Sequence, residues 1–317
     1  MAAAEPRISV IIPARDAADH IGRAVSAALE RAREVRSDIE IIVVDDGSSD
    51  DTASAARSAG ARLLSLPRGP GNPGRARNRG AAAASGDLLV FLDADCVPAA
   101  GWLKAILAAH AAGHRCVGGS LARPPGLPAT ARWDYYFSSY HVHPGRAPGR
   151  VANHTPANLS VERGLLLRTE GFSELLPVAN GHEELAWQAQ LVDLGGAIYF
   201  EPEAMVQHWN RPGLGNLFRR TYRWAYSSLQ SKVENSAARA AWQYRYPRLS
   251  LFAAFPLAPL HAAYIVGCWL RAGVLEPALV FPLLLAARFV YAAGTVAGGM
   301  RWLRERSPDS LAAPDPA

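Results

Sequence analysis

The sequence predicts an α/β fold with a mostly parallel, open sheet flanked by helices, followed by a C-terminal apolar helical hairpin. Short apolar runs alternate with segments of helical periodicity along the first 200 residues, a pattern typical of strands buried on both faces between helices. Two longer runs near the C-terminus carry almost no charge. At 317 residues, the chain is long enough for one large domain or two, with a substantial core.

Each expected element follows from its local pattern. Continuous apolar runs predict strands at residues 8–12, 39–44, 62–66, 88–92, 115–121 and 197–200. Apolar residues at helical spacing predict helices at residues 16–33, 50–59, 75–84 and 102–110, and a further one from Leu214. Residues 123–150 are expected to form a loop that carries aromatic side chains, because prolines and glycines recur along them.

Carboxylates directly follow two of the predicted strands. Asp45 and Asp46 end one strand, and Asp93 and Asp95 end another. The carboxyl ends of parallel strands meet at one edge of an open sheet, where ligands bind. Charge at the end of a buried strand is costly unless a cation or hydrogen-bond donors compensate it, so these acids are candidates to hold a divalent metal that carries a phosphate. Alternatively, an isolated Asp-x-Asp caps the helix that follows.

Three arginines, Arg75, Arg77 and Arg79, lie near the start of the helix predicted for residues 75–84. The free backbone N–H groups at a helix N-terminus already favour an anion, so this cluster predicts phosphate binding. For Arg75 and Arg79, which are four residues apart, an ordinary solvated helix face is the alternative.

Four motifs occur in one order along the first hundred residues. They are Ile8-Ser-Val-Ile-Ile-Pro13, Val43-Val-Asp-Asp-Gly-Ser-Ser-Asp50, Ala76-Arg-Asn-Arg-Gly80 and Phe91-Leu-Asp-Ala-Asp95. Together they resemble family 2 glycosyltransferases of the GT-A fold, a Rossmann-like architecture. The resemblance implies a nucleotide-sugar donor and a divalent metal cofactor, Mg or Mn. The family commonly has a third acid after its Asp-x-Asp, where this chain has Cys96.

The resemblance also implies roles for single residues of the donor site. Asp46, with Pro13 beside it, would meet the base, and Arg77 would meet the base or the diphosphate. Asp93 and Asp95 would meet the ribose and the metal-bridged diphosphate. The donor-binding candidates are therefore Pro13, Asp45, Asp46, Arg77, Asp93 and Asp95.

The stretch Gly181-His-Glu-Glu-Leu-Ala186 stands where the family has its acidic Gly-Glu-Asp motif. Glu183 and Glu184 fall at the expected Glu-Asp, which implies that Glu184 is the catalytic base and Glu183 its neighbour in the site. A base at this position must accept the proton of the acceptor hydroxyl while the anomeric carbon is attacked from the opposite side, an inverting displacement. Alternatively, the two glutamates are first-turn acids that interact with a helix dipole.

Two further motifs supply candidates downstream. His208 lies where a family histidine approaches the metal or diphosphate; a buried structural histidine is the alternative. Arg220-Thr-Tyr-Arg-Trp224 resembles the Gln-x-x-Arg-Trp element of processive family members, with Arg in place of Gln. Arg220, Arg223 and Trp224 are therefore candidates to contact the acceptor or diphosphate, on a helix at the acceptor mouth or membrane surface.

Positive charge is concentrated before the apolar C-terminal runs. Eight cationic side chains and one acid, Glu234, lie between Arg211 and Arg248, and the net charge of the chain is +5. This arrangement suits anionic lipid headgroups, and no nucleic-acid-binding motif accompanies it. The expected partners are a nucleotide-sugar donor, a lipid-linked or glycan acceptor and the membrane surface, but not nucleic acid.

Two apolar runs, Leu249–Leu270 and Val274–Met300, approach the length that spans a bilayer. Pro256, Pro259 and Pro282 favour kinks, or a re-entrant or interfacial hairpin. Arginines on both sides of the apolar pair predict that both of its ends lie in the cytoplasm. The start of the chain has no secretory pattern, and the three cysteines are widely spaced, so the N-terminal part is also expected in the cytoplasm. A buried helical pair that covers the catalytic domain is the alternative.

These patterns predict four parts. They are a catalytic domain at 1–210, with a nucleotide-sugar half at 1–100 and an acceptor half at 101–210, basic amphipathic interfacial helices at 211–248, an apolar hairpin at 249–303 and a disordered tail at 304–317. The expected function is inverting sugar transfer to a lipid-linked or cell-envelope acceptor at the cytoplasmic face of the membrane. The alternative is a catalytically silent module of the same fold that binds nucleotide or a partner. A nicotinamide enzyme is disfavoured because no Gly-x-Gly-x-x-Gly follows the first strand.

Overall fold

The computed structural model describes residues 6–35, 38–69, 71–174, 182–234 and 245–306. The strands are β1 (Ile8–Ala14), β2 (Ile39–Asp45), β3 (Arg62–Ser65), β4 (Leu88–Leu92), β5 (Cys96–Pro98), β6 (Cys116–Ala122), β7 (Gly149–Val151), β8 (Asn158–Glu162) and β9 (Ile198–His208). The helices are α1 (Ala18–Ala32), α2 (Thr52–Ser58), α3 (Pro73–Ala83), α4 (Trp102–Ala111), α5 (Ala129–Ser138), α6 (Arg163–Leu166), α7 (Leu185–Asp193), α8 (Leu214–Tyr226), α9 (Ser228–Glu234), α11 (Pro247–Ala253), α12 (Ala258–Arg271), α13 (Glu276–Leu279) and α14 (Phe281–Glu305).

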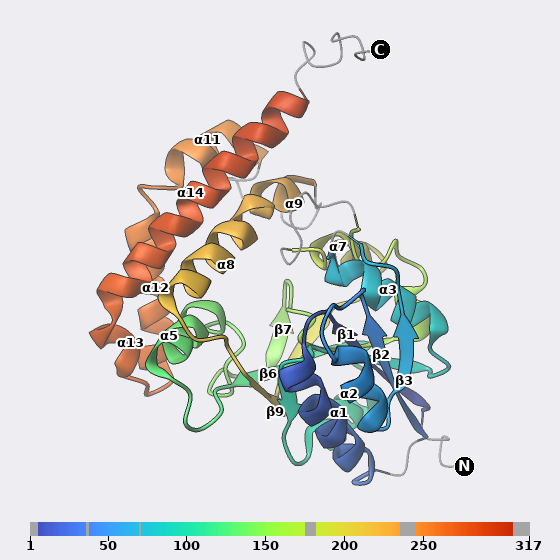
Figure 1. The fold of residues 1–317 in the computed structure, drawn as a ribbon. Helices are drawn as coiled ribbons and strands as arrows, with labels where there is room; N and C mark the ends of the chain where they lie inside the picture. The colour runs from blue at the N-terminus through green and yellow to red at the C-terminus, as the bar shows by residue number, and fades with distance from the viewer. Residues whose placement is uncertain (1–5, 36–37, 70, 175–181, 235–244, 307–317) are drawn as a thin grey trace. The chain divides into compact units, whose positions relative to one another are not determined.

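The chain divides into two compact units. The first comprises Met1–Glu174 and Glu183–Pro212, and the second comprises Leu175–His182 and Gly213–Ala317. Figure 1 shows the sheet of the first unit and the long helices of the second.

One mixed sheet organises the first unit, with strand order β3-β2-β1-β4-β8-β6-β9-β5 and with β7 paired to β9. The strands β1, β2, β3 and β4 are parallel to one another, whereas β8 is antiparallel to both β4 and β6. The predicted α/β class with a sheet flanked by helices is confirmed. The parallel strands bring the acidic ends of β2 and β4 to the same edge of the sheet.

The sheet is covered on both faces because successive residues of its strands point to opposite sides. Val10 and Ile12 of β1 join one core cluster with residues of α1 and α4, such as Ile21 and Trp102. Ile11 joins a second cluster with residues of α3, α6 and α7. This burial on both faces explains why the strands read as continuous apolar runs.

The predicted loop at residues 123–150 is wrong, because it contains the helix α5. The prolines that suggested a loop lie on either side of the helix, and Pro128 is its N-cap residue, a position where proline costs little. Tyr135, Tyr136 and Phe137 are buried, so the aromatic side chains serve packing. The short strands β5, β7 and β8 were not predicted from the sequence, and β9 extends well beyond the predicted residues 197–200.

The second unit is helical in its described residues. Figure 1 shows α8 (gold) and α14 (red) running side by side within it. Among the described residues, one helix, α14, is long and apolar enough to cross a membrane by length and composition, and α11 and α12 together pass the same test but are bent by 78°. The bend occurs at the prolines that predicted a kink, Pro256 and Pro259, whereas Pro282 lies in the first turn of α14.

Residues 304 and 305, which were expected to belong to a disordered tail at 304–317, belong to α14. Residues 307–317 lie outside the described part of the chain.

Candidate active site

The candidate donor residues gather at the edge of the sheet where the parallel strands end. Residues 8–14 of β1 pair in register with residues 39–45 of β2, so Arg15 and Asp46 leave the sheet side by side. Asp93 and Asp95 leave β4, the neighbour of β1 on its other side. The expectation of one acidic edge therefore agrees with the strand order.

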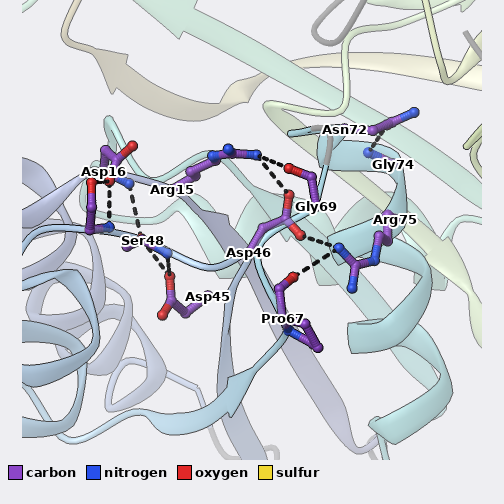
Figure 2. A network of polar contacts seen from close by, with 11 residues as sticks. Arg15, Asp16, Asp45, Asp46, Ser48, Pro67, Gly69, Asn72, Gly74 and Arg75 are labelled. Atoms are coloured by element: carbon purple, nitrogen blue, oxygen red, sulfur yellow. Dashed lines mark hydrogen bonds and ion pairs between the residues drawn. The ribbon is translucent and has the colours of Figure 1, made fainter.

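Asp46 is a buried carboxylate held between two arginines. Arg75 Nη1 donates to Asp46 Oδ1 at 2.9 Å, and Arg15 Nη1 lies 3.6 Å from Asp46 Oδ2. The same two guanidinium groups donate to the carbonyl oxygens of Pro67 and Gly69, as Figure 2 shows. Burial raises the pKa of Asp46 above its ordinary value, although both arginines oppose the shift. The group presents acceptor and donor atoms side by side, as recognition of a base edge requires.

Asp45 has a different environment from its neighbour. Its Oδ1 atom accepts hydrogen bonds from the backbone N–H and the hydroxyl of Ser48, which fixes the turn after β2 (Figure 2). Asp16 accepts in the same way from Ser49 across the turn. Pro13 is buried within β1. The structure thus places Asp45 in the support of the site, next to Asp46.

Arg77 joins two motifs that are far apart in sequence. Its Nη2 atom donates to Asp93 Oδ1 at 2.6 Å, and its Nη1 atom donates to Glu183 Oε1 at 2.8 Å. Arg77 and Glu183 are buried, whereas Asp93 is partly exposed. Burial alone would lower the pKa of Arg77, but the two carboxylates raise it, so the guanidinium stays charged. Arg77 therefore holds the Asp-x-Asp motif against the start of α7.

Glu184 lies beside this ion cluster, immediately before α7. It retains some solvent contact but has dense protein surroundings, and this burial raises its pKa to about 8. The charge of Glu183 adds to the shift, while Arg77 opposes it. Glu183 is held in its ion pair with Arg77, so Glu184 is the carboxylate suited to exchange a proton near neutral pH.

His208 and Asp95 form the part of the site that best fits a cation. Asp134 Oδ2 accepts from Asn210 Nδ2 at 2.9 Å, which turns Asn210 Oδ1 toward His208 Nδ1, also at 2.9 Å. The proton of a neutral His208 is thereby placed on Nδ1, and the lone pair of Nε2 faces Asp95 Oδ1 at 3.5 Å. Two acceptors that face each other need a cation or a proton between them.

The ligand atoms of Asp95, Cys96 and His208 lie within 4.8 Å of one another. Burial, with the charges of Asp95 and Asp93, raises the pKa of the Cys96 thiol well above its ordinary value, which disfavours the thiolate that binds metals. The oxygen and nitrogen atoms of Asp95 and His208 suit Mg²⁺ or Mn²⁺, with further sites left for diphosphate oxygens. Asp93 instead points one oxygen at Arg77.

The remaining candidates lie on α8 in the second unit. Trp224 stacks on His182 with 5.8 Å between the ring centroids, and Arg220 lies 5.9 Å from the centre of the Trp224 ring. Arg223 is exposed. All three residues lie on α8.

Three residues that shape the site were not predicted from the sequence. Arg15 directly follows β1, the strand that ends beside Asp46, and its position after a predicted strand could have identified it as a site residue. Asp134 and Asn210 support His208, but Asp134 lies in the segment expected to be a loop and its partner is 76 residues away. No local pattern reveals a contact of that sequence separation.

Comparison with known proteins gives a consistent result. Residues 9–161 match the family model described as glycosyl transferase family 2. The chain is 29% identical over 228 residues to the pre-mycofactocin glycosyltransferase of Mycobacterium tuberculosis, a match that covers 67% of this chain but 45% of that relative. It is 29% identical over 226 residues to glycosyltransferase AglE of Haloferax volcanii, covering 69% and 71% of the two chains.

A solved structure shares the fold. The mannosyltransferase PcManGT from Pyrobaculum calidifontis, in complex with GDP-Man and Mn²⁺, aligns with a TM-score of 0.59 and 21% sequence identity. The alignment covers 92% of this chain and 87% of the other.

Proposed function

This chain belongs to glycosyl transferase family 2 and has its GT-A fold, and we propose that it transfers a hexosyl or related sugar from a nucleotide diphosphate sugar to an acceptor hydroxyl. The observation that carries the proposal is Glu184, a carboxylate with a raised pKa beside the charged cluster that ends β4. A proton acceptor and an anion-binding edge are the two parts that such a transfer needs.

The donor site is proposed to use the edge of the sheet. The acceptor and donor atoms of Asp46, Arg15 and Arg75 suit hydrogen bonding to a nucleobase. Asp95 and His208 would hold a divalent metal, as the facing acceptor atoms indicate. The metal, when bound, would neutralise charge on the diphosphate leaving group. PcManGT, which shares the fold, was solved with GDP-Man and Mn²⁺.

Glu184 is proposed to accept the proton of the acceptor hydroxyl as that oxygen attacks the anomeric carbon. Attack from the side opposite the diphosphate inverts the configuration at that carbon. Arg77 fixes the position of Glu183 and so of the adjacent Glu184, and its buried charge favours the ionised form of Glu184. The protein thus supplies orientation and a tuned base.

The acceptor is proposed to be a lipid-linked or cell-envelope glycan at the cytoplasmic face of the membrane. The support is the second unit, where an apolar helix long enough for a bilayer, a bent apolar pair and exposed arginines occur together. A catalytically silent nucleotide-binding module is the second candidate, because Glu replaces the expected Asp at position 184 and Cys96 replaces the third acid.

The test is transfer from a panel of nucleotide sugars with Mg²⁺ or Mn²⁺, using wild type and matched variants. Asp95→Ala and Glu184→Ala should each abolish transfer, since one removes a cation ligand and the other the base. Asp87→Ala, an exposed acid at the opposite end of β4, should keep full activity. Wild-type turnover in both site variants would contradict the roles given to Asp95 and Glu184. If the wild-type protein binds the donor but neither transfers nor hydrolyses it, the catalytically silent module is favoured.

A second variant tests the support of the cation site. Asn210→Ala frees His208 to place its proton on Nε2, so we expect the metal concentration for half-maximal activity to rise about 10-fold to 100-fold. Activity should recover at saturating metal. An unchanged metal dependence would contradict the role given to His208.

A further inference from the structure

The exposed apolar side chains of the protein are concentrated in the second unit. Of the sixteen large hydrophobic residues that are exposed in the described part of the chain, twelve lie between Tyr246 and Met300. The most exposed are Phe252 on α11, 81% exposed, and Leu279 on α13, 82% exposed. Apolar exposure on this scale marks an interaction surface.

These residues form faces rather than isolated positions. On α12, Leu260 and Tyr264 are exposed one turn apart, opposite the buried Ala262, Ile265 and Trp269. The helix is therefore apolar on its packed side and on its exposed side. Such a helix is typical of contact with lipid or with another apolar surface.

Exposed arginines flank the apolar faces. Arg248 lies on α11, Arg271 ends α12, and Arg301 and Arg304 lie in the last turns of α14. The acids Glu276 and Glu305 are the only ones in the described residues 245–306. This excess of positive charge complements anionic headgroups and favours a lipid surface over an apolar protein partner.

The packing of α14 on α8 limits how much of α14 lipid can surround. Gly294 and Gly298, spaced four residues apart, lie directly on α8, and a Cβ atom at either position would collide with the backbone carbonyl of Tyr222 or Tyr226. Small residues at this spacing allow close helix contact, in membranes as in water. The second half of α14 is thus covered by α8.

Insertion of the covering helix α8 into a bilayer is unfavourable in free energy. It carries Arg219, Arg220 and Arg223, which are next to or within one turn of Tyr222. An arginine near the bilayer centre is strongly disfavoured. The part of α14 from Gly294 onward therefore stays at the polar side with α8.

The rest of α14 is too short to cross. Residues 281–293 rise about 20 Å, against the roughly 30 Å of a bilayer core. The pair α11 and α12, with its 78° bend, is not a straight span either. Within this segment Arg288 hydrogen-bonds His261 of α12 at 3.0 Å, so a charge lies among the packed helices where a spanning helix would meet lipid.

We propose that α11, α12, α13 and the first half of α14 insert into one leaflet of an anionic bilayer and do not cross it. The exposed apolar side chains of this part, among them Phe252, Leu260 and Leu279, face the acyl chains, while the exposed arginines at the helix ends, Arg248 and Arg271 among them, remain at the level of the headgroups. The inference rests on the membrane association proposed above and makes it specific: the protein is held on one face of the membrane by a shallow helical wedge.

The test places a probe at Leu279, on the inserted apolar face, in the full-length chain. Leu279→Cys is made in a Cys268→Ala background, because Cys96 and Cys116 are buried. The matched control is Leu167→Cys, an exposed leucine of the first unit. Each cysteine carries a bimane on protein bound to phosphatidylcholine vesicles with phosphatidylglycerol, and nitroxide lipids and aqueous iodide serve as quenchers.

At Leu279→Cys we expect quenching by the nitroxide lipids and protection from iodide, with the reverse at Leu167→Cys. In bacterial spheroplasts that express the protein, a membrane-impermeant maleimide should label Leu279→Cys only after detergent is added. Labelling in intact spheroplasts would show a spanning hairpin and overturn the proposal. Full access of iodide to Leu279→Cys, with no binding to vesicles, would also overturn the proposal, because it would show that the apolar face does not enter lipid.

A charge variant gives an independent reading. The double change Phe252→Glu and Leu279→Glu should weaken binding to these vesicles more than 10-fold, whereas Leu167→Glu should leave it unchanged. Donor binding, followed by thermal shift in the same samples, should persist in all variants. If wild type does not bind the donor, the proposed function is contradicted. If the double variant binds vesicles as well as wild type does, the membrane insertion is contradicted but the proposed function is not.

Discussion

Glu184 links the geometry of the site to its pH dependence. Burial and the charge of Glu183 raise its pKa to about 8, so at neutral pH the base is mostly protonated. We expect the transfer rate at saturating donor to fall about 10-fold for each pH unit below that pKa, because the base works in its ionised form. Initial rates between pH 5.5 and 9 measure this dependence.

The control for this profile is Glu203→Gln, which removes an exposed carboxylate on β9 and should leave the profile unchanged. Glu184→Asp should move the profile because the shorter side chain changes the distance to Glu183 and Arg77. A rate that is flat from pH 6 to 9 in wild type would contradict a base with a pKa near 8.

The sequence could predict residue identities at the site but not their pairing. Asp46, Arg77, Asp93 and Asp95 were each singled out, yet nothing in their order shows that Arg77 contacts Asp93 and Glu183 at once. Glu183 is 106 residues from Arg77, so their contact depends on the fold. The cost of burying a charge predicts that these acids have cationic or hydrogen-bonding partners, but it does not identify the partners.

At the scale of elements, α3 is a rigid support whose two faces have opposite roles. Arg77 is buried against Asp93 and Glu183, while Arg79, two residues later, is exposed. Arg77→Ala should cost about 3–5 kcal/mol of the free energy of unfolding, because it leaves a buried carboxylate without its partner. Arg79→Ala should change it by less than about 0.5 kcal/mol.

Denaturant unfolding of the two variants and wild type provides the measurement. Arg77→Lys should not restore full stability, since one ammonium cannot reproduce two guanidinium hydrogen bonds in different directions. Equal stability of the Arg77 and Arg79 variants would argue that the ion cluster contributes nothing net to folding.

Elements with strong periodicity were predictable, and short or interrupted ones were not. The parallel strands β1, β2 and β4 are buried on both faces, so their apolar runs are continuous and easy to recognise. In contrast, α5 begins after a run of prolines that reads as loop, and β8 has no continuous apolar run because Leu159 and Val161 alternate with polar residues. The antiparallel insertion of β8 between β4 and β6 depends on tertiary pairing, which no local signal encodes.

At the scale of the whole molecule, the two units are expected to respond to different ligands. Asp46, Asp95, Glu184 and His208 all lie in the first unit, and the exposed apolar helices lie in the second. Nucleotide with Mn²⁺ at 100 times its Kd should stabilise the first unit by about 2.7 kcal/mol through mass action. Lipid should stabilise the second in the same manner.

Calorimetry of the full chain in anionic lipid nanodiscs and in detergent tests this separation. We expect two transitions, of which nucleotide shifts one and the change from detergent to lipid shifts the other. A single transition that moves with either ligand would mean that the units unfold together.

The bridge made by Arg77 also has an evolutionary consequence. One guanidinium pairs with both Asp93 and Glu183, so a change at any of the three positions leaves the others mismatched. Descendants of this sequence should therefore inherit the three positions as a unit or replace them in concert, and an alignment of close homologues should show them co-varying. A library randomised at position 77 alone should return arginine, whereas one randomised at all three positions should yield new solutions.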